Sequence, residues 1–440
     1  MLTWLAVFTI GTLLALILFR LTSVLVALTL VPIVAALAGG FGPQVGTFAM
    51  DGIRAVTPVA ALLAFAVIYF GVMNEAGLFE PIVRALVRVA GGDPVRIAVG
   101  TAAMASIAHL DGAGASTFMV TVPAMLPIYQ RAGMSPLTLT SIVALAAGTM
   151  NMLPWAGPTT RAAASLHVST SELFVPDLFA MAAGLASVFV LAIHAGRRER
   201  ARLGVRPGAE QGQTRVKPRS ELGLTPVEPR SDPGLTPRWF FNAALTVGTL
   251  VALFVELVPL AVVFIVASAI ALVVNYPSAH VQRERLTAHA AAAMMMVTII
   301  FAAGVFTGIL TKSGMLTALS STLVHALPAG MLPHLPVAMA VTSMPLSLAF
   351  DPDSFYFGLF PVLANAAQAA GGSAIEVGRA AILGQMTTGF PVSPLTPSTF
   401  LLMGLADVDL ADHQRRTIPY AFGVTLIMTA VAVASRAIQW

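Results

Sequence analysis

The feature that most constrains this chain is a succession of apolar stretches, each about as long as a lipid bilayer is thick. A helix needs about 20 apolar residues to cross the hydrocarbon core. Only 10% of the 440 residues are charged, whereas soluble globular proteins carry about 25% charged residues. The sequence therefore predicts an all-α polytopic protein of the lipid bilayer, with crossings near 2–19, 22–40, 57–74, 137–166, 174–195, 239–256, 258–275, 290–310, 376–405 and 417–435.

Two further stretches, 95–130 and 335–370, are long enough to enter the membrane and return to the same side. Each has a polar middle, "HLDGAGAST" at 109–117 in the first and "FDPDSFYFG" at 350–358 in the second. Non-helical backbone at that depth is tolerated only where it is buried in protein or lines a water-filled cavity. Both stretches are therefore predicted to be re-entrant helical hairpins.

The chain is predicted to contain two similar halves, 1–195 and 239–440, joined by a polar linker at 196–238. The linker is rich in Pro, Gly and Arg, a composition typical of a connecting segment without a core. "YFGVMNEAGLF" at 69–79 aligns with "FTGILTKSGML" at 306–316, an offset of 237, and "NMLPWAGP" aligns with "TGFPVSPL" at the same offset. With about five crossings per half, the halves have opposite orientations, which is the inverted repeat common in secondary transporters.

The basic residues predict the orientation of the chain. Most of the 24 Lys and Arg residues fall on the side of the linker, and the positive-inside rule places that side in the cytoplasm. We expect external termini and a location in the bacterial inner membrane. The basic residues lie in loops and give no indication of nucleic-acid binding. The chain has no cysteine, which excludes disulfides and thiolate metal sites, and it has no HExxH or GxSxG motif of an enzyme.

Two of the expected helices, 137–166 and 376–405, are interrupted by prolines. The interruptions read "NMLPWAGPTTR" at 151–161 and "TGFPVSPLTPST" at 388–399. A helix interior does not tolerate several prolines, because each removes a hydrogen bond and clashes with the preceding turn. Broken helices at matching positions of two halves point to a substrate site. The candidate substrate ligands in these segments are Asn151, Gly157, Thr159, Arg161, Ser393, Thr396 and Ser398.

Three aspartates in the hairpin middles, Asp111, Asp351 and Asp353, require a reason to lie in the membrane. A charged side chain at the bilayer centre costs at least about 2.5–3.5 kcal/mol on insertion scales. All three are candidate metal ligands, and Asp111 and Asp353 are also candidates for binding the coupling ion. The alternative is that the aspartates cap helices near the water interface.

The residues beside these aspartates are candidate donors to an anion. Glycines let the backbone approach a ligand closely, and a helix N-terminus presents N–H groups to negative charge. Ordinary helix capping is the alternative for the hydroxyls. The candidates are Gly112, Gly114, Ser116, Thr117 and Ser354.

Two basic side chains lie near these interruptions. Arg161 follows the first broken helix, and its guanidinium suits bidentate binding of a carboxylate. That carboxylate belongs to the substrate or to an internal aspartate. His109 lies one turn before the hairpin middle and can titrate near neutral pH, which makes it a candidate for ion coupling. The alternative for His109 is a packed structural residue.

Several motifs together resemble the citrate–metal–proton symporter family of the ion transporter superfamily. They include "YFGVMNEAGLFEPIV", "LDGAGASTFMVTVPAMLPIYQRAGM", "MNMLPWAGPTTRA", "DSFYFGLFPVLA" and "LADVDLADHQR". The resemblance covers nearly the whole chain except the linker. It implies proton-driven uptake of citrate as a complex with a divalent cation of the Mg or Ca class, no permanently bound cofactor, a homodimer and an elevator-like movement. Asp111, Asp353 and Arg161 match the family pattern.

The chain departs from that pattern at two positions. The family's first hairpin reads like D-G-D-G-T, where this chain has Ala113 in place of the second Asp. The second reads like S-N-D, where this chain has Asp351-Pro352-Asp353. The exchange leaves open which metal accompanies the substrate, and whether one is needed. A sodium-coupled di- or tricarboxylate carrier remains an alternative, and a cation/proton antiporter or channel is an alternative of another class.

Overall fold

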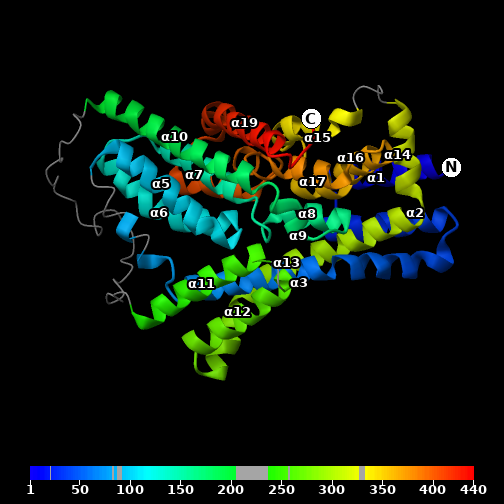
Figure 1. Ribbon diagram of the computed structural model, residues 1–440, viewed down its shortest axis with the longest axis horizontal. Coiled ribbons are helices and arrows are strands. Elements are labelled where there is room, and N and C mark those ends of the chain that lie inside the picture. The colour runs from blue at the N-terminus through cyan, green and yellow to red at the C-terminus, as the bar shows by residue number, and fades with distance from the viewer. Residues whose placement is uncertain (20, 82–83, 87–91, 205–235, 256–257, 327–331) are drawn as a thin grey trace.

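The computed structural model describes residues 1–440 except 20, 82–83, 87–91, 205–235, 256–257 and 327–331. The described residues form helices and connecting loops without a strand. Four of the helices described are long and apolar enough to cross a membrane on their own. The N- and C-termini lie to the right in Figure 1, away from the linker-bearing ends of α10 and α11.

The first half contains the predicted hairpin and broken helix. The hairpin is α5 (Pro94–Ala108) and α6 (Gly114–Arg131), joined by a short 3-10 turn. The broken helix is α7 (Pro136–Met150) and α8 (Gly157–Leu166). The remaining described helices are α1 (Leu2–Leu18), α2 (Val24–Ala38), α3 (Val45–Glu75), α9 (Thr170–Phe174) and α10 (Leu178–Leu203).

The second half repeats this order. Its hairpin is α15 (Leu335–Leu346) and α16 (Phe360–Ala369), with a π-helical segment at Ser354–Leu359 before α16. Its broken helix is α17 (Ala374–Ile382) and α18 (Pro397–Ala406). The other helices are α11 (Pro237–Val255), α12 (Leu260–Asn275), α13 (Ala279–Lys312), α14 (Met315–Ala326) and α19 (Leu410–Ala434).

The packing of the helices has the symmetry of an inverted repeat. Helix α2 packs on α13, and its counterpart α12 packs on α3. Helix α5 packs on α7 and α10, and its counterpart α15 packs on α17 and α19. Figure 1 shows α3 and α13 lying side by side below the hairpins and broken helices. The fold is therefore two inverted halves, each with a re-entrant hairpin and a broken helix.

Four helices differ from the sequence expectation. Helix α3 begins at Val45 and α13 at Ala279, about three turns before the predicted starts at 57 and 290. At 1.5 Å per residue, such helices exceed the roughly 30 Å of hydrocarbon, so their polar first turns project beyond it. Helix α10 continues to Leu203, past the predicted start of the linker at 196, because its last turns carry arginines that are stable in water. Helix α14 was not predicted.

The seam between α3 and α13 is made of glycines. A Cβ atom on Gly52 would lie 1.9 Å from the carbonyl oxygen of Gly304, and one on Gly308 would lie 2.5 Å from the carbonyl oxygen of Phe48. Only hydrogen fits at these positions. Small residues spaced by four let membrane helices approach closely enough for backbone packing. This seam joins the two halves along their longest helices.

Candidate substrate-binding site

The first broken helix ends at Met150 and restarts at Gly157. Between them the chain turns at Asn151–Ala156, and the Thr159 hydroxyl donates back to the Met152 carbonyl over 2.8 Å. No side chain caps the N-terminus of α8. Its first-turn N–H groups therefore have no side-chain acceptor, which is the arrangement of an anion-binding helix end.

The two broken helices meet at their interruptions. The Asn151 side-chain amide donates to the Met386 carbonyl over 2.6 Å. A Cβ on Gly148 would lie 2.9 Å from the Thr387 carbonyl oxygen, so the backbones touch. The structure thus brings together two segments that the sequence places about 237 residues apart. Residues from both halves can contact one ligand at this crossing.

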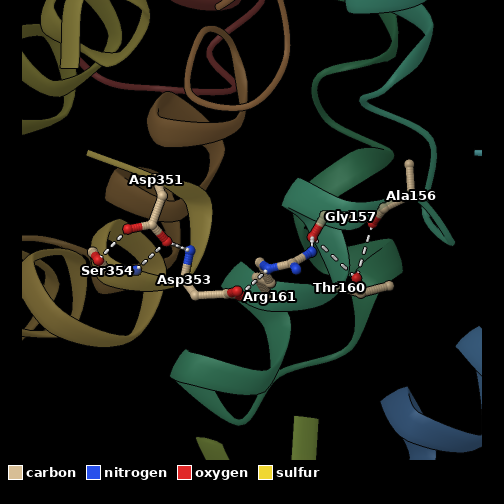
Figure 2. Close-up of polar contacts among 7 residues, drawn as sticks. All are labelled: Ala156, Gly157, Thr160, Arg161, Asp351, Asp353 and Ser354. Carbon is tan, nitrogen blue, oxygen red and sulfur yellow. Dashed lines mark hydrogen bonds and ion pairs between the residues drawn. The ribbon is translucent and has the colours of Figure 1, made fainter. Parts of the chain in front are cut away.

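Arg161 on α8 forms an ion pair with Asp353 of the second hairpin. Its Nε donates to Asp353 Oδ1 over 2.7 Å, and the two side chains are only 9% and 13% exposed. One terminal nitrogen also donates to the Gly157 carbonyl over 3.3 Å, as Figure 2 shows. A Cβ on Gly157 would lie 3.0 Å from that nitrogen, so glycine makes room for the guanidinium. The partner that the structure gives Arg161 is the internal aspartate.

Asp351 has a different role from Asp353 in the same hairpin. Its Oδ1 accepts from the backbone N–H groups of Asp353 and Ser354 over 3.0 and 3.1 Å, and its Oδ2 accepts from the Ser354 hydroxyl. A carboxylate that binds the first N–H groups of a helix is a helix cap. Asp351 therefore fastens the start of the return segment, and Ser354 is part of that fastening.

Asp111 fastens the tip of the first hairpin in the same way. Its Oδ1 accepts from the Ala113 N–H over 2.9 Å, and its Oδ2 accepts from the Ser116 hydroxyl. Gly112 has a φ of 71°, in the left-handed region that glycine adopts without strain. A Cβ on Gly112 would lie 3.3 Å from Ala156, so this tip packs on the first broken helix.

His109 joins the first hairpin to the first broken helix. Its Nε2 lies 3.2 Å from Asn151 Oδ1, and its Nδ1 lies 2.8 Å from the Thr117 hydroxyl. Because the Asn151 amide nitrogen donates to Met386, its oxygen faces His109 and requires a proton on Nε2. Nδ1 then accepts from Thr117. A neutral imidazole requires the Thr117 hydroxyl to donate to Nδ1, and the Ala113 carbonyl at 2.9 Å competes for the same proton. The ring is fully buried, which favours a packed structural residue.

The second broken helix contacts both hairpins. The Ser393 hydroxyl donates to the Ser347 carbonyl over 2.5 Å, next to the second hairpin. Helix α18 packs on α6 of the first, and a Cβ on Gly114 would lie 3.5 Å from the Ser398 hydroxyl. Thr396 precedes α18 but makes no side-chain cap. The N-terminus of α18 is therefore uncapped like that of α8.

The candidate metal ligands are not gathered at one point. Among the residues described, no group of three or more His, Asp or Glu side chains could hold a metal ion. Asp353 faces Arg161, whereas Asp111 and Asp351 bind their own loops. These three carboxylates therefore do not form a joint cation site in this arrangement.

Sequence reasoning missed two polar residues at the crossing. Ser347 and Gln385 are buried, and the serine hydroxyl donates to the glutamine side-chain oxygen over 2.6 Å. The Tyr356 hydroxyl donates to the Gln385 carbonyl over 3.0 Å. The signal was available, because Gln385 is an amide in an otherwise apolar part of the 376–405 stretch.

Inverted halves whose hairpins and broken helices converge on buried polar groups define a secondary transporter. Comparison with known protein families agrees with this class. A family described as "Citrate transporter" matches residues 4–389, and the chain belongs to this family. It is therefore a transporter and not an enzyme.

Curated relatives extend over almost the entire chain. A protein of Bacillus subtilis (strain 168) named "Citrate transporter" is 43% identical over 411 residues, which are 93% of each chain. Another from the same organism, named "Mg(2+)/citrate complex secondary transporter", is 38% identical over 426 residues, 97% of this chain and 96% of the relative.

Two solved transporter structures share the fold. The Alcanivorax borkumensis YdaH transporter has a TM-score of 0.59 at 16% identity, covering 91% of this chain and 89% of its own. Neisseria gonorrhoeae MtrF has a TM-score of 0.60 at 14% identity, covering 92% of this chain and 86% of its own. These likenesses concern the architecture of the helices alone.

Proposed function

We propose that the protein imports citrate, in complex with a divalent cation, by proton symport across the bacterial inner membrane. The observation that carries the proposal is the buried pair of Arg161 and Asp353, which links the first broken helix to the second hairpin at 2.7 Å. The family and the names of two relatives support citrate and the magnesium complex as the substrate class.

Substrate binding begins in this proposal with competition for Arg161. A citrate carboxylate is a chemical equivalent of Asp353 and fits the same guanidinium fork. The uncapped N-termini of α8 and α18 offer further donors to its other carboxylates. Ser393, Thr396 and Ser398 border the α18 end, and Asn151, Gly157 and Thr159 border the α8 end.

Displacement of Asp353 links transport to protons. A carboxylate that loses its partner in a site this deeply buried is costly if it stays charged. Protonation of Asp353 removes that cost, and so does contact with the cation of the complex. Binding of citrate and neutralisation of Asp353 therefore favour each other. Asp111 is held by its own loop, so it reaches a coupling ion or cation only when the hairpin tip opens.

The metal enters this scheme as cargo. Citrate carries three carboxylates and a hydroxyl, and oxygen ligands are what Mg and Ca prefer. Because the described residues form no cluster of three metal-binding side chains, citrate supplies most of the ligands and the protein adds at most one or two carboxylates.

The proposal also includes an elevator-like movement of hairpins and broken helices against α3 and α13, in a homodimer with a cytoplasmic linker. The glycine seam supports α3 and α13 as one scaffold, because it lets the two helices pack closely over their backbones. A loaded site with neutral groups crosses the bilayer at lower cost than one with an unpaired charge, which is the physical basis of coupling.

Uptake of labelled citrate into proteoliposomes tests the proposal. With an inward proton gradient and no sodium, we expect accumulation when magnesium or calcium is present and little without it. Metal-independent accumulation would mean that free citrate is the substrate. Uptake that required sodium instead of the proton gradient would replace the proposal with a sodium-coupled carrier.

A further inference from the structure

A second concentration of charge lies far from the substrate site, where the linker-side ends of α10 and α19 meet. A hollow of about 530 Å³ there is lined by seven residues, four of them arginines and one a glutamate: Arg198, Glu199, Arg202, Arg415, Arg416, Pro419 and Tyr420. The lining thus carries an excess of three positive charges.

The single glutamate of this hollow is already occupied. Glu199 Oε2 accepts from Arg202 over 2.7 and 2.9 Å, and its Oε1 accepts from the Thr138 hydroxyl over 2.6 Å. Arg416 donates to the same hydroxyl over 2.7 Å. Because Glu199 is nearly fully buried, it anchors the floor of the hollow and has no capacity for the outer arginines.

Of the two outer arginines, Arg198 has no ion pair with a carboxylate among the residues described, and Arg415 has one exposed pair, with Asp412. Arg198 contacts the Tyr420 hydroxyl at 3.4 Å. Arg415 comes within 3.9 Å of Asp412, but its side chain is 82% exposed. Two guanidinium groups from different helices therefore face one hollow with most of their donors directed outward.

The depth of the hollow matches the phosphate layer of a bilayer. About 20 helical residues cross the hydrocarbon, and counting from the far ends at Leu178 and Ala434 brings α10 to Arg198 and α19 to Arg415. The same helices expose apolar side chains farther in, including Val190 at 64% and Ile427 at 45%.

Helices α10 and α19 are also the most lipid-exposed of the four long apolar helices. In the apolar 18-residue segment of each helix, 28% of α10 and 39% of α19 is buried, against 56% of α3 and 61% of α13. An apolar wall below a cationic hollow has the two properties that a phospholipid requires, one for its acyl chains and one for its headgroup. Basic pockets between membrane helices on the cytoplasmic side bind anionic headgroups.

We propose that the hollow between α10 and α19 binds the headgroup of an anionic phospholipid, with its acyl chains along the exposed faces of both helices. The lipid phosphate contacts Arg198 and Arg415 and is backed by Arg416. Since Glu199 also ties α10 to Thr138 at the start of α7, the bound lipid braces the linker-side end of the bundle that carries the first hairpin.

Lipid binding to the purified full-length protein tests this assignment. Native mass spectrometry would compare phosphatidylglycerol with phosphatidylcholine of the same acyl chains. We expect the wild type to retain phosphatidylglycerol preferentially. The double variant Arg198→Gln/Arg415→Gln should bind this lipid about 30-fold more weakly, because it loses two surface charge contacts, one per arginine. The matched control is Arg131→Gln/Arg283→Gln, which removes two exposed arginines outside the hollow and should bind as the wild type does.

Equal retention of both lipids by the wild type, or an undiminished preference in the Arg198/Arg415 variant, would overturn the proposal. Inorganic phosphate provides the remaining arm. If it displaces phosphatidylglycerol at concentrations comparable with the lipid, the hollow is a site for free phosphate and not for a lipid. Both double variants must elute from a size-exclusion column as the wild type does, to show that they are folded. This is expected because the replaced side chains are exposed.

Discussion

The two re-entrant hairpins close their tips in the same way but contact the rest of the protein differently. Asp111 and Asp351 each bind a backbone N–H and a nearby serine of their own loop. Beyond the loop, the first hairpin contacts its broken helix through the neutral pair of His109 and Asn151. The second hairpin contacts the same first broken helix, through the charged pair of Asp353 and Arg161.

The difference shows which property the repeat shares and which it does not. Closing a turn inside the membrane is a requirement of both halves, since free N–H groups there are expensive. A displaceable charge is needed only once per site. In the proposed mechanism, the charged contact of one hairpin is replaced by a substrate carboxylate, while the contact of the other stays formed.

The largest effect is expected from Arg161→Ala. Removing one partner of a buried ion pair costs about 3–5 kcal/mol of stability. Loss of the proposed contact to a substrate carboxylate, worth about 3 kcal/mol, should lower citrate uptake by about 100-fold. The measurement is uptake into proteoliposomes, normalised to inserted protein, with Arg131→Ala as a control for loss of an exposed arginine. The double variant Arg161→Ala/Asp353→Ala should recover thermal stability but not uptake; recovered uptake would remove Arg161 from the site.

Asp353→Asn tests whether the charged contact carries the coupling. The amide keeps the shape of the side chain but cannot take a proton. We therefore expect the uptake rate to fall by up to about tenfold and no longer to respond to a proton gradient. The readout is the ratio of initial rates with and without the gradient. An unchanged ratio would place proton coupling elsewhere.

Asp111→Asn and Asp351→Asn form a matched pair that tests the shared role. Each replaces a carboxylate that accepts on both oxygens by an amide that can accept on only one, so each should lower stability by about 1 kcal/mol and keep its response to the gradient. Thermal unfolding in detergent and the same ratio of rates measure both properties. Loss of the response in Asp111→Asn alone would move a coupling function into the first hairpin.

The smallest effect is expected from His109→Gln. The glutamine can keep a hydrogen bond to Asn151 but not the one to Thr117, a loss of about 1 kcal/mol. Uptake should fall a few-fold, and the shape of its pH profile should stay that of the wild type, because His109 is fully buried between protein partners as a packed structural residue. A shifted profile would show that His109 takes part in coupling.

Hairpins, broken helices and the inverted repeat could be predicted because each has a local physical cause. Prolines cannot continue a helix, and polar residues are too costly to leave in lipid. The extended starts of α3 and α13 were missed, because hydropathy indicates the hydrocarbon boundary and not the end of a helix. Helix α14 has no strong apolar run of spanning length.

The site was predictable to the level of segments but not of partners. The sequence named Arg161 and Asp353, yet it could not decide between a substrate and an internal partner for the arginine. That choice depends on how two halves cross, which is a property of the tertiary structure. Ser347 was missed for the same reason, since its importance follows from lying at the crossing, whereas Gln385 could have been noticed as an amide in an apolar part of the 376–405 stretch.

The glycine seam bears on how loss-of-transport variants of this protein are interpreted in a genetic screen. Any side chain at Gly52, Gly304 or Gly308 collides with the facing backbone, so such alleles remove the protein from the membrane before it meets its substrate. On a growth plate they score the same as Arg161 variants. Immunoblots of the membrane fraction separate the two groups, and alleles that cluster on one stripe of α3 and α13 indicate failed assembly.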